Sequence, residues 1–446
     1  MIGGGFAGMA AAIALQERRH EVVLLERRGV LGGRATSYRD AVSGEDVDNG
    51  THLMIGAYAA TLDLVARAGA LDLLLVQDHL RIDYVDDAGP SALDCPPLPA
   101  PLHLLAGVLG LRLPWRARAQ ALRFGLAAFR RPPGGITLAE WLRRTGQGPE
   151  ARRLLWDPLA TAILNETPER AAAALFYNVF REAFLRSHAA SRLVFLRRGY
   201  GQLHERLGRY LESRGGVVRR RAMAEAVDVE DGRVTGVRYV QRARSRDEIR
   251  AGTRPVAERV AAEAVVAAVP WKAVPPLVPE AARSQPPFVG LAGLRGSPIV
   301  SIELWLDRVV VDRPMVGLRD CEIEWVFDKG RLYGRQGAPQ HLAFIASAAY
   351  RSIPRPNPEL VGAAEAALRR YFPAMAQAAV TRSLVIREPD ATFASDPEAE
   401  ALRPGTLTPI RGLFLAGDWT DTGLPATIEG AVRSGFAAAR AVEAMA

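Results

Sequence analysis

Three glycines near the start of the chain have the spacing that binds the phosphates of a dinucleotide. Gly3, Gly5 and Gly8 follow the pattern G-x-G-x-x-G. The first glycine permits a tight turn, the second lets backbone approach a pyrophosphate, and the third lets helix and strand pack closely. Residues 9–16 are strong helix formers, so the amides that begin this helix would face the phosphates. The cofactor-binding residues expected in this turn are Gly3, Gly5, Phe6, Ala7 and Gly8.

An acidic residue follows where recognition of a ribose requires one. Residues 21–25 read Glu-Val-Val-Leu-Leu, which predicts a buried parallel strand, and Glu26 and Arg27 come directly after it. A carboxylate at this strand end accepts hydrogen bonds from ribose hydroxyls. Glycine turns also arise by chance, but the turn, helix, strand and acid together predict a dinucleotide site.

The next residues indicate which dinucleotide is bound. Gly33 and Arg34, within the run Gly-Gly-Arg-Ala-Thr at 32–36, would bring backbone amides and a guanidinium close to the pyrophosphate. This extension resembles the flavoproteins that include amine oxidases and carotenoid desaturases, which bind FAD, and simple NAD dehydrogenases do not carry it. In that group, the segment corresponding to 48–56 returns past the isoalloxazine ring. The resemblance implies flavin contacts from Gly50 and Thr51 and places His52 near flavin or substrate, although a histidine that merely caps a turn is an equal alternative.

A second flavin signature stands at the other end of the chain. An apolar strand is expected at 412–416, followed by Gly417 and Asp418, and a helix is expected to begin near Thr427 and Ile428. An acid at the strand end can hold ribityl hydroxyls. The helix would aim its amides at the pyrimidine edge of the flavin, where reduction places negative charge. In the resembling flavoproteins, the strand entering the hairpin at Asp231-Gly232 touches adenine through its backbone, which by position is Ala224.

Length and order of elements predict two intimately joined domains. The chain has 446 residues, of which 49% are hydrophobic. We expect an α/β fold with a Rossmann-like, glutathione reductase-like FAD-binding domain and an interleaved α+β substrate domain, which holds an antiparallel sheet and a helical part. The FAD-binding domain is assigned to 1–75, 195–275 and 405–446, and the substrate domain to 76–194 and 276–404. Because only Met1 and Ile2 precede Gly3, we expect a very short first strand or a natural protein that begins upstream.

The composition of the chain limits the kinds of partner that it is expected to bind. The net charge is +8, almost all of the positive charge is arginine, and genomic base composition is one explanation of it. No nucleic-acid module is present and the basic residues are not interleaved with stacking aromatics, which favours an anionic membrane surface over nucleic acid. Cys95 and Cys321 indicate a reduced, cytosolic protein. No metal cluster, secretory signal or spanning run of about twenty apolar residues is seen.

Residues 97–135 are the candidate membrane-contacting segment. A proline-rich connector leads into an apolar run at 102–111, which Trp115, Arg116, Arg130 and Arg131 flank. This composition suits an interfacial segment, and an ordinary lid helix is the alternative. We therefore expect a cytoplasmic protein attached peripherally to the inner face of the cytoplasmic membrane.

Motifs inside the chain point to one branch of these flavoproteins. The segments 156–159, 165–168, 324–329 and 417–420 resemble the squalene-associated FAD-dependent desaturases, the hydroxysqualene dehydroxylases of bacterial hopanoid pathways. The resemblance implies reductive removal of the hydroxyl of hydroxysqualene to give squalene, with hydride from reduced flavin N5. Such chemistry requires an apolar tunnel, an edge of the flavin without bulk water, and an acid that protonates the leaving water. The candidate acids are His52, Asp328 and Glu324.

Other functions remain open. A carotenoid or phytoene-type desaturase would run hydride from substrate to flavin with the same fold. A flavin-bearing partner of a squalene-synthesis assembly would show no turnover. An amine oxidase is disfavoured, because that branch usually carries a lysine on the strand corresponding to 298–302, which has none. No second dinucleotide fingerprint is present, so we expect an external electron donor.

Overall fold

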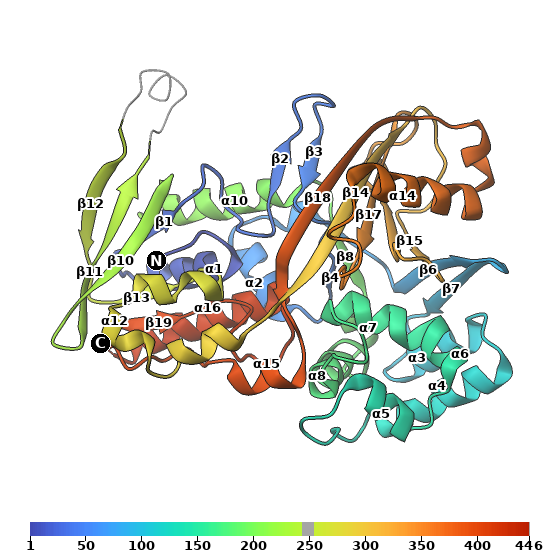
Figure 1. The fold of residues 1–446 in the computed structure, drawn as a ribbon, viewed down its shortest axis with the longest axis horizontal. Helices are drawn as coiled ribbons and strands as arrows, with labels where there is room; N and C mark the ends of the chain where they lie inside the picture. The colour runs from blue at the N-terminus through green and yellow to red at the C-terminus, as the bar shows by residue number, and fades with distance from the viewer. Residues whose placement is uncertain (243–253, 446) are drawn as a thin grey trace.

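Two sheets organise the chain and lie side by side along its longest axis (Figure 1). The computed structural model describes residues 1–242 and 254–445. A parallel sheet with its helices occupies the end where both termini lie, and a seven-stranded sheet occupies the other end. Long connections that cross between the two ends bring distant parts of the sequence together.

The parallel sheet is assembled from strands far apart in the sequence. β1 (Val23–Glu26) pairs in parallel with β9 (Val217–Arg220), and β13 (Val265–Ala267) pairs in parallel with β19 (Leu413–Leu415). Ile2 joins the two pairs through parallel bridges to Leu25 and Ala267, so a single residue stands where a first strand is expected. The strands at 21–25 and 412–416 therefore form at nearly the expected positions.

Two helices pack on this sheet at very short separation. α1 (Phe6–Glu17) starts at the glycine turn, and α16 (Ile428–Glu443) starts after Thr427, whose hydroxyl accepts the Gly430 N–H at 3.0 Å. A Cβ placed on Gly435 of α16 would lie 2.2 Å from the backbone oxygen of Ala7. The close approach of the two helices therefore depends on a glycine.

An antiparallel meander closes the outer edge of this part. It consists of β10 (Ala222–Glu230), β11 (Arg233–Gln241) and β12 (Val256–Ala261). The Asp231-Gly232 turn joins the first two strands with positive φ at both residues, 49° and 73°, as a tight hairpin requires. α10 (Tyr200–Ser213) lies against α1 and the parallel sheet.

The second sheet is mainly antiparallel, as predicted from the sequence. Its strands in spatial order are β18 (Val380–Phe393), β14 (Gly296–Leu306), β17 (Gln340–Ala346), β16 (Trp325–Asp328), β15 (Met315–Leu318), β6 (Leu80–Asp86) and β7 (Gly89–Cys95). The β15–β6 pair alone is parallel in this part of the described chain. One face, which includes Val300, Ile302 and Leu304, packs against α14 (Asn357–Tyr371), and the other face belongs to the hydrophobic cluster that contains residues of the helical segment 157–184. The expected α/β fold with an α+β second part is confirmed.

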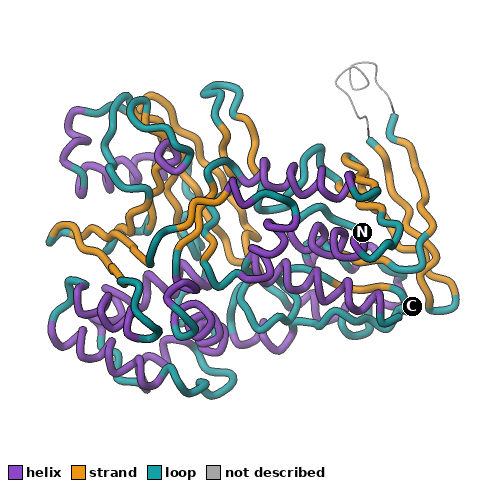
Figure 2. Tube along the Cα trace, turned by 180° about the vertical axis from the view of Figure 1, so that it is seen from behind, coloured by secondary structure: helices purple, strands orange, loops and turns teal. Residues whose placement is uncertain are grey.

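A helical layer lies beside the second sheet (Figure 2). It contains α3 (Leu102–Gly110), α4 (Trp115–Ala127), α5 (Leu138–Arg144), α6 (Pro149–Ala151), the π-helical turn η2 (Arg152–Trp156), α7 (Asp157–Leu164) and α8 (Ala173–Phe184). Aromatic rings from four of these elements pack together around Phe124. Over the described residues, the structure has no helix of the length and hydropathy needed to cross a bilayer.

Short elements connect these layers. The strands are β2 (Ser37–Arg39), β3 (Asp46–Asp48), β4 (Met54–Ile55), β5 (Leu74–Val76) and β8 (Leu193–Leu196). The α-helices are α2 (Ala59–Arg67), α9 (His188–Ser191), α12 (Glu280–Arg283), α13 (Lys329–Leu332) and α15 (Pro397–Leu402). The 3₁₀ turns are η1 (Leu71–Leu73), η3 (Trp271–Ala273), η4 (Pro275–Leu277), η5 (Phe288–Gly293) and η6 (Pro373–Gln377).

Replacing Gly435 with alanine should destabilise the protein by about 1–3 kcal/mol, because the added methyl group forces α16 away from α1. Gly362→Ala in α14 is the matched control. Its Cβ meets no atom within 4 Å, so helix propensity alone should raise stability by about 0.5–1 kcal/mol. Urea unfolding of both variants measures the difference. Equal stability of the two would show that the α1–α16 contact is not tight.

Candidate active site

One cavity of about 790 Å³ runs between the parallel sheet and the seven-stranded sheet. Its first end is formed by the glycine turn, the end of β1 and the turn before α16. Its second end is formed by apolar side chains of α7, α8 and the seven-stranded sheet. The apolar residues of the second end include Leu159, Ile163, Val179, Phe184, Ile299, Met315, Phe327 and Ile345.

The structure brings the predicted cofactor residues to this one cavity. The residues that line it are Gly3, Gly5, Phe6, Ala7, Glu26, Arg27, Gly33, Arg34, Gly50, Thr51, Ala224, Gly417, Asp418, Thr427 and Ile428. Gly8 is the exception, because it lies behind the turn, where a Cβ would be 1.9 Å from the Gly3 oxygen. This position matches the packing role expected of the third glycine.

The first turn of α1 is shaped to receive an anionic group. Gly5 is the N-cap residue and brings no side-chain cap, so the helix start depends on an outside acceptor for its amides. A Cβ on Gly5 would lie in ordinary van der Waals contact with the Gly32 oxygen and the Gly33 Cα, each at 3.8 Å, so the chain itself leaves room for one methyl group there. Gly5, Gly32 and Gly33 all line the cavity, and the uncapped amides beside them suit a pyrophosphate.

Glu26 is fixed at the cavity edge by backbone. The Gly4 N–H donates to Oε2 and the Arg28 N–H donates to Oε1, each at 2.8 Å. Each carboxylate oxygen keeps a second lone pair for a hydroxyl donor. The buried hydroxyl of Thr51, which also lines the cavity, has no hydrogen-bond partner among the described residues. Both groups fit a dinucleotide that carries ribose and flavin.

Arg34 has a different contact from the one expected. Its guanidinium forms an ion pair with Asp418 and donates to the Ala391 oxygen at 2.9 Å. Most of its charge is thereby directed at the strand-end acid rather than at a pyrophosphate. The pair joins the two flavin signatures of the chain across the cavity wall.

His52 lines the cavity as a neutral ring. Burial lowers the pKa of His52, and its Nδ1 lies 2.7 Å from the Gly50 oxygen. A carbonyl oxygen can only accept, so Nδ1 carries the proton and Nε2 is an acceptor. The ring also packs edge-on against Tyr200, with centroids 5.2 Å apart. A neutral imidazole of this tautomer does not donate from Nε2, which argues against His52 as the acid.

Asp328 and Glu324, the other two predicted acids, are not among the residues that line the cavity. Successive side chains of a strand point to opposite faces, and Trp325 and Phe327 occupy the cavity face. Asp328 caps α13 by accepting the Arg331 N–H at 2.9 Å and also accepts from Gln340 at 2.7 Å. The prediction that Asp328 and Glu324 act on a substrate in the cavity is therefore corrected.

The Glu324 carboxyl is nevertheless unusual. Burial raises the pKa of Glu324 to about 8, although the hydrogen bond from the Ser347 N–H at 2.9 Å acts in the opposite direction. The group is thus protonated at neutral pH. Its position beside β16 makes it a determinant of stability rather than a group in contact with ligand.

A buried ion pair that sequence reasoning missed supports the segment 49–52. Lys329 forms an ion pair with Asp48, which also accepts the hydroxyls of Ser37 and, at 2.9 Å, Tyr333. Burial raises the pKa of Asp48, but the Lys329 ammonium and these hydrogen bonds outweigh it, so that the net shift is downward. The sequence contained a signal for this ion pair, because Lys329 is one of only two lysines in the chain.

Polar residues that were not predicted also line the cavity. Asn49 donates to Glu388 of β18 at 2.9 Å, and Asn165 donates to Thr392 at 2.9 Å. Asn49 belongs to the flavin-like segment quoted above. Glu388 has no local pattern that could have identified it, because its position depends on the pairing of β18 with β14.

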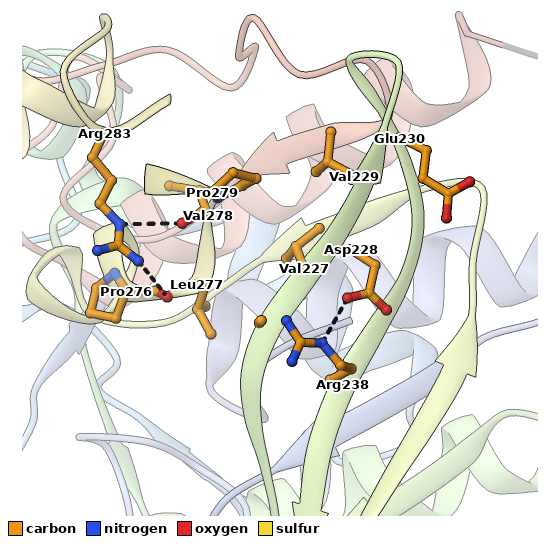
Figure 3. A pocket seen from close by; sticks show the side chains of 11 residues that line it. Val227, Asp228, Val229, Glu230, Arg238, Pro276, Leu277, Val278, Pro279 and Arg283 are labelled. Atoms are coloured by element: carbon orange, nitrogen blue, oxygen red, sulfur yellow. Dashed lines mark hydrogen bonds and ion pairs between the residues drawn. The ribbon is translucent and has the colours of Figure 1, made fainter. Parts of the chain in front are cut away.

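A second hollow, of about 390 Å³, lies between β10 and the segment 276–283 (Figure 3). Three of its charged side chains have partners: Arg238 donates to Asp228 at 2.8 Å, and Arg283 donates to the oxygens of Val278 and Pro276. These contacts indicate a structural role for the side chains around the hollow.

Gly5→Ala should weaken FAD binding at least about 10-fold, which is about 1.4 kcal/mol, without loss of apoprotein stability. The new methyl group fits the chain itself but occupies the space beside the α1 amides. Gly8→Ala is the contrasting variant and should destabilise the fold, because its Cβ meets the Gly3 oxygen. Flavin fluorescence titration and urea unfolding separate the two effects. Unchanged FAD affinity in Gly5→Ala would contradict the binding of the pyrophosphate at the first turn of α1.

Glu324→Gln should gain stability over the unmodified protein as the pH rises from about 5 to 8. Folded Glu324 keeps its proton up to about pH 8, whereas the unfolded chain loses it above a pKa of 4.5. Folding therefore takes up a proton in this window, and stability falls as pH rises, by at most about 1.4 kcal/mol per pH unit. Urea unfolding at several pH values measures this. Parallel stability curves for the two proteins would contradict the shifted pKa.

The chain is similar over almost its full length to a dehydroxylase and to a desaturase. It is 29% identical to hydroxysqualene dehydroxylase of Rhodopseudomonas palustris, over 98% of this chain and 96% of that protein. It is 27% identical to 15-cis-phytoene desaturase of Synechococcus elongatus, over 99% of this chain and 94% of that protein. The predicted resemblance to this group is confirmed.

Solved structures share the fold at lower identity. An oxidoreductase from Methanosarcina mazei superposes with a TM-score of 0.73 at 16% identity, covering 98% of each chain. Cyclohexylamine oxidase from Brevibacterium oxydans superposes with a TM-score of 0.67 at 16% identity, covering 99% of this chain and 97% of the other.

The model of one protein family matches nearly the whole chain. The family is described as flavin containing amine oxidoreductase, and the match covers residues 6–443. The prediction of FAD as the cofactor is confirmed, and the protein is an FAD-dependent oxidoreductase. The glycine turn, the strand-end acids and the family match agree, and the chain belongs to the flavin containing amine oxidoreductase family.

Proposed function

We propose that the protein removes the hydroxyl group of hydroxysqualene reductively to give squalene, in hopanoid or triterpenoid biosynthesis. Bound and reduced, FAD supplies the hydride that replaces the hydroxyl. The observation that carries the proposal is the apolar second end of the cavity, which continues directly from the residues of the flavin end. The similarity to hydroxysqualene dehydroxylase supports the same substrate.

The apolar end suits a long hydrocarbon chain. Side chains of α7 and α8 form one wall, and the cavity face of the seven-stranded sheet forms the other. Burying apolar substrate surface there is worth about 25 cal/mol per Å². These walls also exclude water from the place where a carbon–oxygen bond would ionise. A phytoene-type desaturase is the second candidate, because the similarity to phytoene desaturase is comparable.

We propose that the protein collects its lipid at the inner face of the cytoplasmic membrane through α3 and α4. Leu102, Leu105 and Leu109 of α3 are exposed on one face at 50%, 42% and 51%. At the ends of the neighbouring segment, Trp115 and Phe129 are 73% and 62% exposed. The opposite side of these helices packs in the core through residues such as Phe124. The proposal therefore assigns the two alternatives considered from the sequence, membrane contact and packing on the protein, to different faces of the same helices.

Charge around this surface favours anionic lipid. The exposed basic residues beside the apolar side chains are Arg116, Arg123, Arg130 and Arg131. Arg116 lies over the Trp115 ring, with its guanidinium carbon 5.3 Å from the ring centroid. An external two-electron donor, a nicotinamide cofactor or a redox protein, is proposed to reduce FAD.

Anaerobically reduced protein should be reoxidised by one equivalent of hydroxysqualene, with an equal amount of squalene recovered from the lipid extract. The oxidised protein mixed with phytoene should show no flavin reduction. Absorbance of the flavin and extraction of the lipids are recorded on the same sample. Reduced flavin that persists beside intact hydroxysqualene, with flavin reduction by phytoene, would establish the desaturase instead.

A Leu105→Gln/Leu109→Gln double variant should bind anionic vesicles at least about 10-fold more weakly, because two exposed apolar side chains are lost from the contact face. Turnover of detergent-dispersed hydroxysqualene should be unchanged. Leu407→Gln is the control, because Leu407 is also an exposed leucine, at 70%, but lies outside α3 and α4, in the segment before β19. Vesicle flotation measures binding. Equal flotation of all three proteins would refute the proposed contact.

A further inference from the structure

Glu388 lies on the cavity face of the seven-stranded sheet. It pairs with Ile299 of β14, and both side chains line the cavity. Asn49 donates its side-chain amide to Glu388 Oε1 at 2.9 Å. Asn49 begins the segment 49–52, which lines the flavin end of the cavity up to His52. Glu388 therefore stands where the flavin end meets the apolar end.

Four carboxyl groups line the cavity, of which two are held by other groups of the chain and one is exposed. Glu26 is held by two backbone amides. Asp418 forms an ion pair with Arg34. Glu225 is exposed on β10, next to Ala224. Glu388 is the fourth, half-buried, and its Oε2 has no ion-pair or hydrogen-bond partner in the described part of the chain.

The surroundings of Glu388 do not neutralise it by an ion pair. The charged group nearest in the hydrogen-bond network is Arg34, whose backbone oxygen also accepts from Asn49 at 3.4 Å. The Arg34 guanidinium is already paired with Asp418. His52, at the other end of the segment, is a neutral ring. Asn49 contacts Oε1 alone, so the second carboxyl oxygen of Glu388 is available to the hydroxyl group of a substrate in the cavity.

We propose that Glu388 is the proton donor to the hydroxyl group of the substrate, an inference that rests on the proposed function. The proton passes from the Glu388 carboxyl to the hydroxyl oxygen, the carbon–oxygen bond breaks, and water leaves. The carboxylate so formed faces the carbon cation and balances its charge in a cavity of low dielectric. Bound and reduced, FAD would supply the hydride that the carbon needs to form the new carbon–hydrogen bond.

Glu388→Gln keeps the size of the side chain and an oxygen for the Asn49 contact but removes the acid. The single-turnover rate of squalene formation from reduced protein should fall at least about 100-fold, as for loss of a general acid. FAD content and the affinity for hydroxysqualene should stay within about threefold. Glu230→Gln, at an exposed position of β10 outside this cavity, is the matched control and should react like the unmodified protein.

A second substrate separates proton donation from a structural effect. An ester of hydroxysqualene whose leaving group departs as a weakly basic anion needs no proton. Glu388→Gln and the unmodified protein should convert this ester at similar rates per bound flavin. An equally large loss on the ester would overturn the role, because the variant would then be damaged in another way.

Failure of the role of Glu388 and failure of the proposed function give different results. If the unmodified protein converts hydroxysqualene and Glu388→Gln does so within threefold of its rate, Glu388 is not the donor and the proposed function stands. If the unmodified protein leaves hydroxysqualene unchanged, the proposed function is overturned, and the role of Glu388 falls with it.

Discussion

The cavity exists because the two ends of the chain meet at Arg34 and Asp418. These residues are 384 positions apart in sequence, yet their ion pair joins the loop after the first βα unit to the end of β19. The contact of Gly435 with the backbone of Ala7 brings α16 against α1 in the same region. Without this closure, the acid at one end and the glycine turn at the other could not bind one flavin.

The second wall follows from the alternation of side chains on the seven-stranded sheet. Val300, Ile302 and Leu304 point toward α14, which leaves the opposite face, with Ile299 and Ile345, for the cavity. A single sheet therefore forms part of the hydrophobic core on one side and an apolar chamber on the other. The same alternation brings the Glu388 carboxyl to the chamber, close to the segment that begins at Asn49.

Local backbone chemistry made the flavin end predictable. The roles of Gly5 and Glu26 depend on a strand and a helix only a few residues away in the sequence. The spacing of these residues is therefore enough to identify them. The proton donor was not predictable in this way. Glu324 and Asp328 flank the run Trp-Val-Phe, which is apolar at every position and does not reveal which face is turned inward. Glu388 depends on the pairing of β18 with β14, a contact across more than eighty residues of sequence.

We propose that one cavity holds FAD at its glycine-rich end and an isoprenoid alcohol at its apolar end. A crystal structure of the FAD-loaded protein with an unreactive, saturated analogue of hydroxysqualene tests this most directly. The hydrocarbon should lie between α7–α8 and the seven-stranded sheet, with the hydroxyl oxygen within hydrogen-bond distance of Glu388. An analogue bound outside this cavity, or a flavin that fills the apolar end, would contradict it.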